Sequence, residues 1–532
     1  MRDGVRLSAN VFLASERSRV PTILVRTPYG KGADITPHYQ AFVERGYAIV
    51  VQDVRGRYES EGAFQPLTQE VHDGDDTLNW IARQPWSDGK IGMMGGSYVG
   101  IVQWKAALAN NPHLKAIFPV VSGYDDYRDR YYSTGGAFKI GNRLEWMAEN
   151  LRAPGYHQDF GKFVLHLPVR SADVAALGWT SPMYREVIEH PAFDSFWRAI
   201  STREHLDKVR VPVFAVGGWY DNFVQSDLEA FAALRRNSGV NRILVGPWPH
   251  NMSAPLQNAD FGADSSVPVR ALQLEWFDQW LMGKDSPLLS RPPAKFFVMG
   301  ANKWREEPSW PPPDAREKVF FLGSGGKANS LAGDGALSEK PTRKTDADRF
   351  VFDPYTPVPT RGGAVCCNPR IFPWGPMDQR PVEQRKDVLV YTTKPLKHDL
   401  EILGRVQAVL YVASSARDTD FTAKLVDVFP NGEARNLTDG ILRLRYRNSL
   451  EKPELAKPGD VYRVTVDAGV TANVFLKGHR LRLEISSSNF PRFDRNANTG
   501  DPVEQAAKLV QANQTVYHDG LRPSCLILTA MP

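Results

Sequence analysis

Long hydrophobic runs are missing from this sequence, and no apolar stretch is long enough to span a bilayer. Cysteine is also scarce. The 3 cysteines are too few for a disulfide framework, and their spacing matches no zinc site, so we predict no metal centre. The adjacent Cys366 and Cys367 are expected to be packing or surface residues and not a redox pair.

Charge of either sign is not concentrated in any block. The 65 Lys and Arg against 60 Asp and Glu give a formal net charge of +5, which by itself argues neither for nor against a nucleic-acid partner. We predict no nucleic-acid and no membrane partner, while a homo-oligomer is compatible with the sequence. Without the apolar region of a signal peptide, a cytoplasmic location is the default expectation. Two alternatives stay open: the chain begins at Met1, or it lacks an upstream segment, and in the second case secretion is not excluded.

What the sequence does contain is enough apolar material for a large core. With 532 residues, 42% of them hydrophobic, the chain is globular, and its length corresponds to about two to four domains. Its first part alternates helix-like stretches, such as 70–84, with short apolar and β-branched runs, which predicts an α/β domain with a mostly parallel sheet. These runs are 21–25, 48–51, 91–94, 116–121, 211–216 and 242–245.

The predicted secondary-structure pattern changes twice along the rest of the chain. Between about Tyr124 and Asp207 the strand pattern stops, and helical periodicity with many aromatic residues replaces it. A helical insertion between two strands is a natural cap over the carboxyl edge of the sheet. From about Lys318 onward, short strands separated by turn residues predict an all-β sandwich or jelly roll. The strand candidates there are 405–412, 421–429, 461–466, 481–486 and 525–528.

One serine stands in a glycine-rich turn between a predicted strand and a predicted helix. The stretch reads Gly95-Gly96-Ser97-Tyr98-Val99-Gly100. This is the layout of a nucleophile elbow, a tight turn that holds a serine hydroxyl clear of the backbone. Val99 occupies the place of the second glycine in the generic G-x-S-x-G pattern. Taken alone, the stretch fits an ordinary glycine-rich turn equally well.

A serine nucleophile needs a base, usually histidine, and a carboxylate that orients the base. In sheets with such an elbow, the chain order is serine, acid and histidine, each after a strand. Asp221 follows the run 211–216, and His250 follows the run 242–245. The other histidines precede the serine, lie in the β-rich part or follow no convincing strand. Ser97, Asp221 and His250 are therefore predicted to form a catalytic triad.

The segments around these three positions carry a family resemblance. They read Gly95-Gly96-Ser97-Tyr98-Val99-Gly100, Gly218-Trp219-Tyr220-Asp221 and Gly246-Pro247-Trp248-Pro249-His250. They resemble the signatures of the cocaine esterase/X-Pro dipeptidyl-peptidase family (serine peptidase S15-like, CocE/NonD), whose relatives include α-amino acid ester hydrolases and glutaryl-7-aminocephalosporanic acid acylases. Those enzymes use a G-x-S-Y-x-G elbow, which accounts for Val99. Further similar segments cover essentially the whole chain, at 1–5, 26–31, 52–56, 276–281, 298–300, 357–363 and 516–518.

The resemblance implies an α/β-hydrolase body, an inserted helical cap and a C-terminal jelly-roll (galactose-binding-like) domain. By this resemblance Ser97 is the nucleophile, His250 the general base and acid, and Asp221 the group that orients His250 and stabilises its charge. The expected boundaries are 1–123 and 208–317 for the catalytic domain, 124–207 for the cap and 318–532 for the β-domain.

An oxyanion hole needs two donors aimed at the developing negative oxygen. The backbone N–H of Tyr98, directly after the nucleophile, is expected to be one donor. For the second, the resemblance implies a tyrosine hydroxyl, and Tyr29 in Thr27-Pro28-Tyr29 matches it. Phe223, Tyr131 and Trp146 align with family pocket positions and are expected substrate contacts.

The predicted function is a cofactor-independent serine hydrolase that cleaves a small ester or amide through a Ser97 acyl-enzyme. An aromatic or other apolar acyl group suits a cap-covered pocket. One alternative is an X-Pro dipeptidyl aminopeptidase or an α-amino acid ester hydrolase, which needs cap carboxylates that hold a substrate ammonium. A second alternative is a non-catalytic carbohydrate- or surface-binding protein. The candidate cap carboxylates are Asp125, Asp126, Asp129, Glu145 and Glu149.

Overall fold

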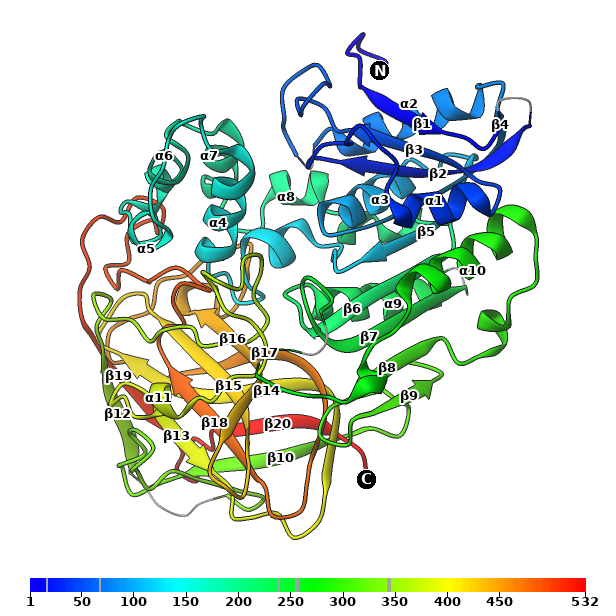
Figure 1. Ribbon diagram of the computed structural model, residues 1–532. Coiled ribbons are helices and arrows are strands. Elements are labelled where there is room, and N and C mark those ends of the chain that lie inside the picture. The colour runs from blue at the N-terminus through cyan, green and yellow to red at the C-terminus, as the bar shows by residue number, and fades with distance from the viewer. Residues whose placement is uncertain (16–17, 67, 238–239, 254–255, 257, 342–345) are drawn as a thin grey trace.

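The computed structural model describes residues 1–532 except 16–17, 67, 238–239, 254–255, 257 and 342–345. An N-terminal α/β part, a helical insertion and a C-terminal β-rich part make up the molecule (Figure 1). This arrangement confirms the predicted fold class. Within the described residues, no helix has the length and apolar character needed to cross a membrane.

The N-terminal part is built on nine strands. Their bounds are β1 (Ala9–Phe12), β2 (Val20–Thr27), β3 (Ala48–Asp53), β4 (Ser87–Gly96), β5 (Leu114–Val120), β6 (Val213–Tyr220), β7 (Asn241–Pro249), β8 (Ala294–Val298) and β9 (Lys303–Glu307). They lie in the order β1-β3-β2-β4-β5-β6-β7-β8-β9. The pairs from β3 to β8 are parallel, and β1 and β9 join the edges antiparallel. The carboxyl ends of the parallel strands therefore meet along one edge.

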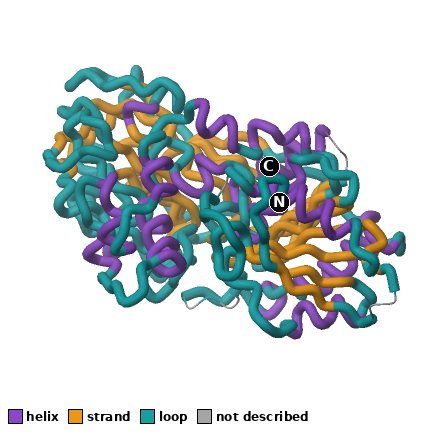
Figure 2. Tube along the Cα trace, turned by 90° about the horizontal axis from the view of Figure 1, so that it is seen from above, coloured by secondary structure: helices purple, strands orange, loops and turns teal. Residues whose placement is uncertain are grey.

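Helices cover both faces of this sheet, so its strands are apolar on both sides (Figure 2). In β2, Ile23 packs with Phe42 and Trp276 on one face, while the next residue, Leu24, packs on the opposite face. This alternation explains why the strands read as continuous apolar runs in the sequence. The flanking helices are α1 (Pro37–Glu44) and α10 (Val269–Met282) on one face, and α2 (Glu70–Ala82), α3 (Tyr98–Leu108) and α9 (Val224–Asn237) on the other.

The helical insertion lies between β5 and β6 and has an aromatic core. Tyr127 stacks on Tyr132 with ring centroids 4.7 Å apart, and Trp197 meets Tyr127 edge-on at 5.3 Å. Such contacts bury large apolar area with defined geometry. The insertion is thereby held as a compact layer above the carboxyl edge of the sheet. Its helices are α4 (Ile140–Leu151), α5 (Phe160–Phe163), α6 (Ala172–Leu177), α7 (Pro182–Ile188) and α8 (Ser195–Ile200).

The C-terminal part is β-rich, as predicted. Its longest strand, β14 (Leu400–Ser414), pairs with β17 along one side and with β19 and β20 along the other. The remaining elements are β10 (Arg316–Gly323), β11 (Ala336–Ser338), β12 (Ala347–Phe352), α11 (Arg380–Glu383), β13 (Leu389–Thr392), β15 (Asp420–Val428), β16 (Ala434–Arg443), β17 (Tyr462–Phe475), β18 (Arg480–Ser486), β19 (Ala512–Tyr517) and β20 (Cys525–Ala530). The exact domain boundaries stay predictions, because strand pairing does not mark where independently folding units end.

The turn between β4 and α3 is tightly packed. A Cβ on Gly95, whose φ is +136°, would lie 2.2 Å from Val99 Cγ1, so the valine fills the space that the glycine leaves. A Cβ on Gly100 would lie 2.6 Å from Ser122 Cβ and 3.2 Å from the Gly95 carbonyl oxygen. Gly100, which stands one residue later than the second glycine of the generic G-x-S-x-G pattern, is therefore required where α3 passes the end of β5.

Gly100→Ala should destabilise the protein, because the added methyl group overlaps Ser122 and the neighbouring backbone. Overpacking of this kind costs roughly 1–3 kcal/mol of unfolding free energy, measurable as a lower urea midpoint of tryptophan fluorescence. Gly161→Ala is the matched control, since its added Cβ would meet nothing within 4 Å. Equal midpoints for the two variants would contradict the close packing at Gly100.

Candidate active site

Ser97 occupies a strained position between β4 and α3. Its backbone angles are φ 56° and ψ −127°, a region that residues with a Cβ rarely adopt. The Ser97 N–H donates to the Val120 carbonyl at 2.9 Å, and the Ser97 carbonyl accepts from the N–H groups of Gly100 and Ile101. The backbone is thus fastened to β5 on one side and to α3 on the other. This turn holds the side chain at the carboxyl edge of the sheet.

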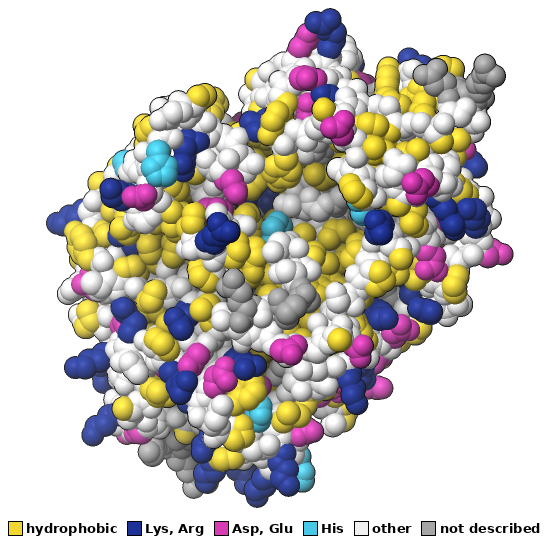
Figure 3. Space-filling view, in the orientation of Figure 1, with side chains coloured by type: hydrophobic (Ala, Val, Ile, Leu, Met, Phe, Trp, Pro, Cys, Tyr) yellow, Lys and Arg dark blue, Asp and Glu magenta, His cyan; other side chains and the backbone are white. Residues whose placement is uncertain are grey.

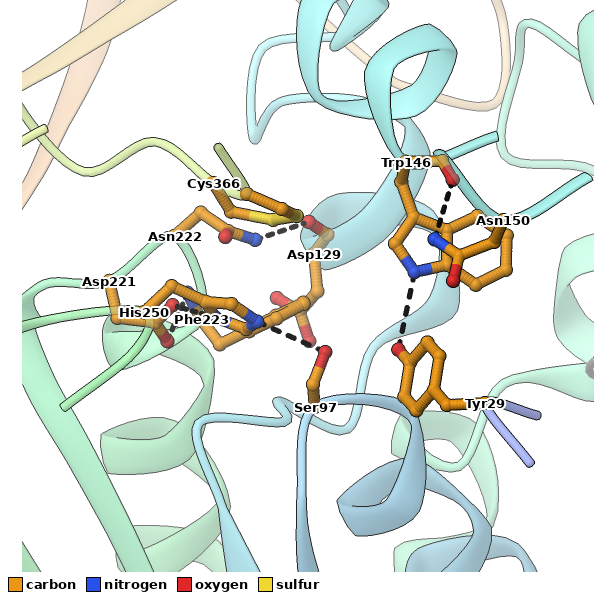
Figure 4. The surroundings of a disulfide bond; sticks show 11 residues. Tyr29, Ser97, Asp129, Trp146, Asn150, Asp221, Asn222, Phe223, His250 and Cys366 are labelled. Carbon is orange, nitrogen blue, oxygen red and sulfur yellow. Dashed lines mark hydrogen bonds and ion pairs between the residues drawn. A yellow bond between two sulfur atoms is a disulfide. The ribbon is translucent and has the colours of Figure 1, made fainter. Parts of the chain in front are cut away.

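The structure brings Ser97, Asp221 and His250 together (Figure 4). His250 Nε2 lies 3.0 Å from Ser97 Oγ, and His250 Nδ1 lies 2.7 Å from Asp221 Oδ1. Each residue directly follows a parallel strand, namely β4, β6 and β7. Because these strands end at the same edge, three distant segments place their side chains in one hydrogen-bonded chain.

Asp221 is fully buried, whereas the His250 side chain is 11% exposed. The second carboxylate oxygen of Asp221 accepts the Phe223 N–H at 3.1 Å, and the Phe223 ring lies 5.7 Å from the His250 ring. These contacts fix the carboxylate and pack one side of the imidazole. Because Asp221 accepts a hydrogen bond from Nδ1, a neutral His250 carries its proton on Nδ1. Its Nε2 is then free to accept the proton of Ser97.

Two further carboxylates lie behind the catalytic candidates. Asp129 accepts the N–H groups of Tyr124 and Asp125, at 2.9 and 2.7 Å, and Asp227 accepts the Gly123 N–H at 3.0 Å. Burial, followed by the charge of Asp221, raises the pKa of Asp227 well above its usual value. Burial, followed by the charge of Asp125, raises the pKa of Asp129 to about 7. A protonated Asp227 removes a negative charge that would otherwise repel Asp221.

Tyr98 begins helix α3, where the first N–H groups have no partner within the helix. Its phenol is buried and donates to Glu70 Oε1 at 2.6 Å, while Glu70 Oε2 receives Arg26 Nη1 at 2.7 Å. Burial, then the Glu70 carboxylate, raises the pKa of Tyr98 well above its usual value, so the phenol stays protonated. This anchor holds the Tyr98 backbone N–H beside Ser97, as an oxyanion donor requires.

Tyr29 follows β2 by two residues and lies at the same edge of the sheet. Trp146 Nε1 donates to the Tyr29 hydroxyl oxygen at 3.2 Å, and the two rings meet edge-on at 6.5 Å. Because the indole supplies a donor, the phenolic hydrogen of Tyr29 is free to point elsewhere. Both side chains border the pocket above Ser97 (Figure 4).

We call the hollow above Ser97 the Ser97 pocket. It encloses about 420 Å³ of empty space, open solvent included. The corresponding face of the molecule is hollowed where its parts meet, and hydrophobic side chains surround the hollow (Figure 3). The predicted contacts Phe223, Tyr131 and Trp146 all line it. The complete lining is Tyr29, Pro66, Ser97, Tyr98, Ile101, Arg130, Tyr131, Arg143, Trp146, Phe223, Cys366 and Cys367.

The charged side chains of the Ser97 pocket are both cationic. Arg143 lies over the rings of Tyr131 and Trp146, 5.1 and 5.5 Å from their centroids. Arg130 pairs with Asp126 below the pocket. Within the described residues, no Asp or Glu lines the pocket. The pocket therefore has aromatic walls and one lining cation, Arg143, whose charge no ion pair among the described residues balances.

Three carboxylates of the cap, those of Asp125, Asp126 and Asp129, are engaged elsewhere. Asp126 accepts a hydrogen bond from the buried Lys105 at 2.5 Å, in addition to its ion pair with Arg130. Asp125 accepts the N–H groups of the turn that it begins, and Asp129 accepts backbone N–H groups as described above. Glu149 is exposed, and burial followed by Glu149 raises the pKa of Glu145 to about 7. None of these five lines the Ser97 pocket in the part of the chain that the structure describes.

Cys366 and Cys367 form a disulfide that borders the Ser97 pocket. The expectation of ordinary packing or surface residues is wrong, because the segment between β12 and α11 brings the pair over the catalytic edge of the other domain. Sequence reasoning also missed Arg143. For the cysteines one signal was available: the pair follows closely on Gly362-Gly363, which end a stretch that resembles the family. No sequence pattern around Arg143 indicated that its face of the helix lines the pocket.

Known proteins resemble this chain along its whole length. Residues 3–252 match the family model of X-Pro dipeptidyl-peptidase (S15 family), and residues 289–527 match that of the X-Pro dipeptidyl-peptidase C-terminal non-catalytic domain. A cocaine esterase from Rhodococcus sp. (strain MB1 Bresler) is 39% identical over 558 residues, covering 99% of this chain and 96% of that relative.

Solved structures agree with this placement. An α-amino acid ester hydrolase is 27% identical with a TM-score of 0.85, covering 100% of this chain and 95% of the other. An aminopeptidase from a marine sediment archaeon, Thaumarchaeota archaeon, is 26% identical with a TM-score of 0.85 and the same coverage. From these similarities and its architecture, the chain belongs to the cocaine esterase/X-Pro dipeptidyl-peptidase (S15) family of α/β-hydrolases and is a serine hydrolase.

Proposed function

We propose that this protein hydrolyses small carboxylic esters or amides through an acyl-enzyme on Ser97. The observation that carries the proposal is the hydrogen-bonded chain Ser97–His250–Asp221 at the floor of a pocket, with distances of 3.0 and 2.7 Å. These contacts lie within the hydrogen-bond reach that a nucleophile and its base need. The family supports a hydrolase, which removes the ground for a non-catalytic binding protein.

In the acylation step, His250 Nε2 takes the Ser97 proton while Oγ attacks the substrate carbonyl carbon. Asp221 orients the ring and stabilises the imidazolium that forms. The carbonyl oxygen gains negative charge, which the Tyr98 N–H and the Tyr29 hydroxyl stabilise. As the tetrahedral intermediate collapses, His250 gives its proton to the leaving alcohol or amine. The product of this step is an ester of Ser97.

Deacylation repeats the sequence with water. His250 accepts a proton from the water as its oxygen attacks the acyl carbon, and then returns the proton to Ser97 Oγ as the bond breaks. The carboxylic acid leaves and the free serine is restored. Burial raises the pKa of Asp227 behind the site, and a protonated carboxyl there favours this cycle, because a second negative charge would compete with Asp221 for the imidazolium.

The Ser97 pocket supports an acyl group that is apolar or aromatic and carries no ammonium. Tyr131, Trp146 and Phe223 offer flat apolar surface, and Arg143 adds a positive charge, whereas Arg130 is paired with Asp126. An α-ammonium group would meet the Arg143 guanidinium, and among the described residues no carboxylate lines the pocket to receive the ammonium. The pocket thus favours an esterase or acylase of non-amino substrates over a dipeptidyl aminopeptidase or an α-amino acid ester hydrolase.

Tyr29→Phe removes the proposed second oxyanion donor and leaves the ring in place. Loss of one such donor costs roughly 10²–10³ in turnover, so kcat for 4-nitrophenyl ester hydrolysis should fall by this factor while KM changes little. Tyr355→Phe is the control, since this tyrosine is 67% exposed and remote from the pocket. Unchanged acylation in Tyr29→Phe would remove Tyr29 from the mechanism.

A substrate panel tests the reaction and its specificity together. For matched pairs of phenylalanine esters, kcat/KM should be higher for the N-acetylated form than for the free amine, because only the amine brings positive charge to Arg143. Ser97→Ala is the control for the chemistry and should lose roughly 10⁴–10⁶ in kcat on every substrate. Preference for the free amine would favour the aminopeptidase alternative, and full activity in Ser97→Ala would refute the proposed nucleophile.

A further inference from the structure

The disulfide of Cys366 and Cys367 lies within reach of the proposed catalytic base. Both residues line the Ser97 pocket, and Cys366 is 3% exposed. Both Sγ atoms lie within 4.8 Å of a ring nitrogen of His250, and Cys366 is seen near His250 and Phe223 in Figure 4. The C-terminal part of the chain thereby brings two sulfur atoms to a site otherwise built by the α/β body and the cap.

These three side chains could hold a metal ion. The two Sγ atoms and a ring nitrogen of His250 all lie within 4.8 Å of one another, and no other such group of His, Cys, Asp or Glu was found in the described residues. Zinc binds thiolates at about 2.3 Å and imidazole at about 2.0 Å, which places tetrahedral ligands roughly 3.5–3.8 Å apart. Once the sulfur–sulfur bond is open, the two Sγ atoms are free to separate toward that spacing.

We propose that reduction of the Cys366–Cys367 disulfide creates a binding site for a thiophilic divalent cation, Zn²⁺, formed by the two thiolates and His250. Occupancy of this site switches hydrolysis off, an effect that rests on the proposed function. The ring nitrogen left for the metal is Nε2, because Asp221 holds Nδ1 at 2.7 Å. A carboxylate on the other nitrogen of a metal-bound histidine is a common supporting arrangement.

The electron and proton balance is simple. A reductant of the thiol class supplies two electrons and two protons to the disulfide, which gives two thiols and leaves the reductant as a disulfide. Zinc then displaces the two thiol protons and binds the neutral imidazole. The lone pair on Nε2 that would accept the Ser97 proton is now bound to the metal. Ser97 keeps its position but loses its base.

The closed disulfide explains why the two states should differ. A sulfur atom in a disulfide is not a thiolate, and thiolates are the ligands that zinc prefers. The oxidised protein therefore offers the metal only His250, and its hydrolysis should be insensitive to zinc. The same residues thus form a wall of the pocket in one redox state and a metal site in the other.

The test compares zinc inhibition of the full-length protein in its two redox states. Phosphine-treated protein should lose about nine-tenths of its 4-nitrophenyl ester hydrolysis at a ZnCl₂ concentration about tenfold above the dissociation constant. EDTA should restore it, and untreated protein should keep its rate. The reduced double variant Cys366→Ser/Cys367→Ser, compared with its own zinc-free rate, should be insensitive. Cys525→Ser, which changes the remaining cysteine in β20, should respond like the unmodified chain.

Two readouts independent of turnover complete the test. Denatured, unreduced protein should contain one titratable thiol, that of Cys525, because the other two cysteines are paired. Equilibrium dialysis of reduced Ser97→Ala should give about one bound zinc per chain, and much weaker binding when both adjacent cysteines are serine. Three thiols in the unreduced protein, or equal zinc inhibition of the double variant, would overturn the inference.

The two proposals fail in different ways. If hydrolysis depends on Ser97 but reduced Ser97→Ala binds no zinc, only the metal site is refuted. If hydrolysis does not depend on Ser97 while zinc still binds through the cysteines, the proposed function fails and the metal site stands as a binding site alone.

Discussion

The positive φ of Ser97, held at 56° with ψ at −127°, is the constraint on which the rest of the site depends. A residue with a Cβ costs roughly 1–3 kcal/mol in such a conformation and keeps it only where its surroundings leave no alternative. Here those surroundings are the bond from the Ser97 N–H to Val120, the start of α3, and glycines at 95 and 100 that let neighbouring atoms approach. The strain places Oγ at the edge where Asp221 and His250 also arrive.

The pocket around that serine is assembled from parts far apart in the sequence. The cap is tied to the C-terminal part by the Phe138 N–H, which donates to Asp494 at 2.9 Å, and by the Gly141 N–H, which donates to the Pro491 carbonyl at 2.9 Å. Arg443 in turn holds Asp494 in a buried ion pair. Breaking such a pair leaves an uncompensated buried charge, so the geometry is strongly specified. The β-rich part is therefore a structural component of the active site as well as a neighbour of it.

The sequence predicts the site well where strand order determines position. Ser97, Asp221 and His250 could be selected because the carboxyl ends of parallel strands share one edge, whatever the length of the insertions between them. The same logic says nothing about Arg143, whose place depends on which face of α4 turns inward. Strand order also does not predict the position of Cys366 and Cys367, because they belong to a loop of the C-terminal part. Pairing and proximity of this kind depend on tertiary packing, and no local periodicity encodes them.

The central claim is that Ser97 Oγ is the atom that becomes acylated. Its most direct test is to treat the protein with a fluorophosphonate, digest it and locate the modified residue by mass spectrometry. The account predicts one phosphonylated peptide, containing Gly95-Gly96-Ser97-Tyr98, with the added mass on the serine. Labelling should be lost in His250→Ala, which folds around the same elbow but lacks the base. A label on any other residue, or no label on active protein, would contradict the account.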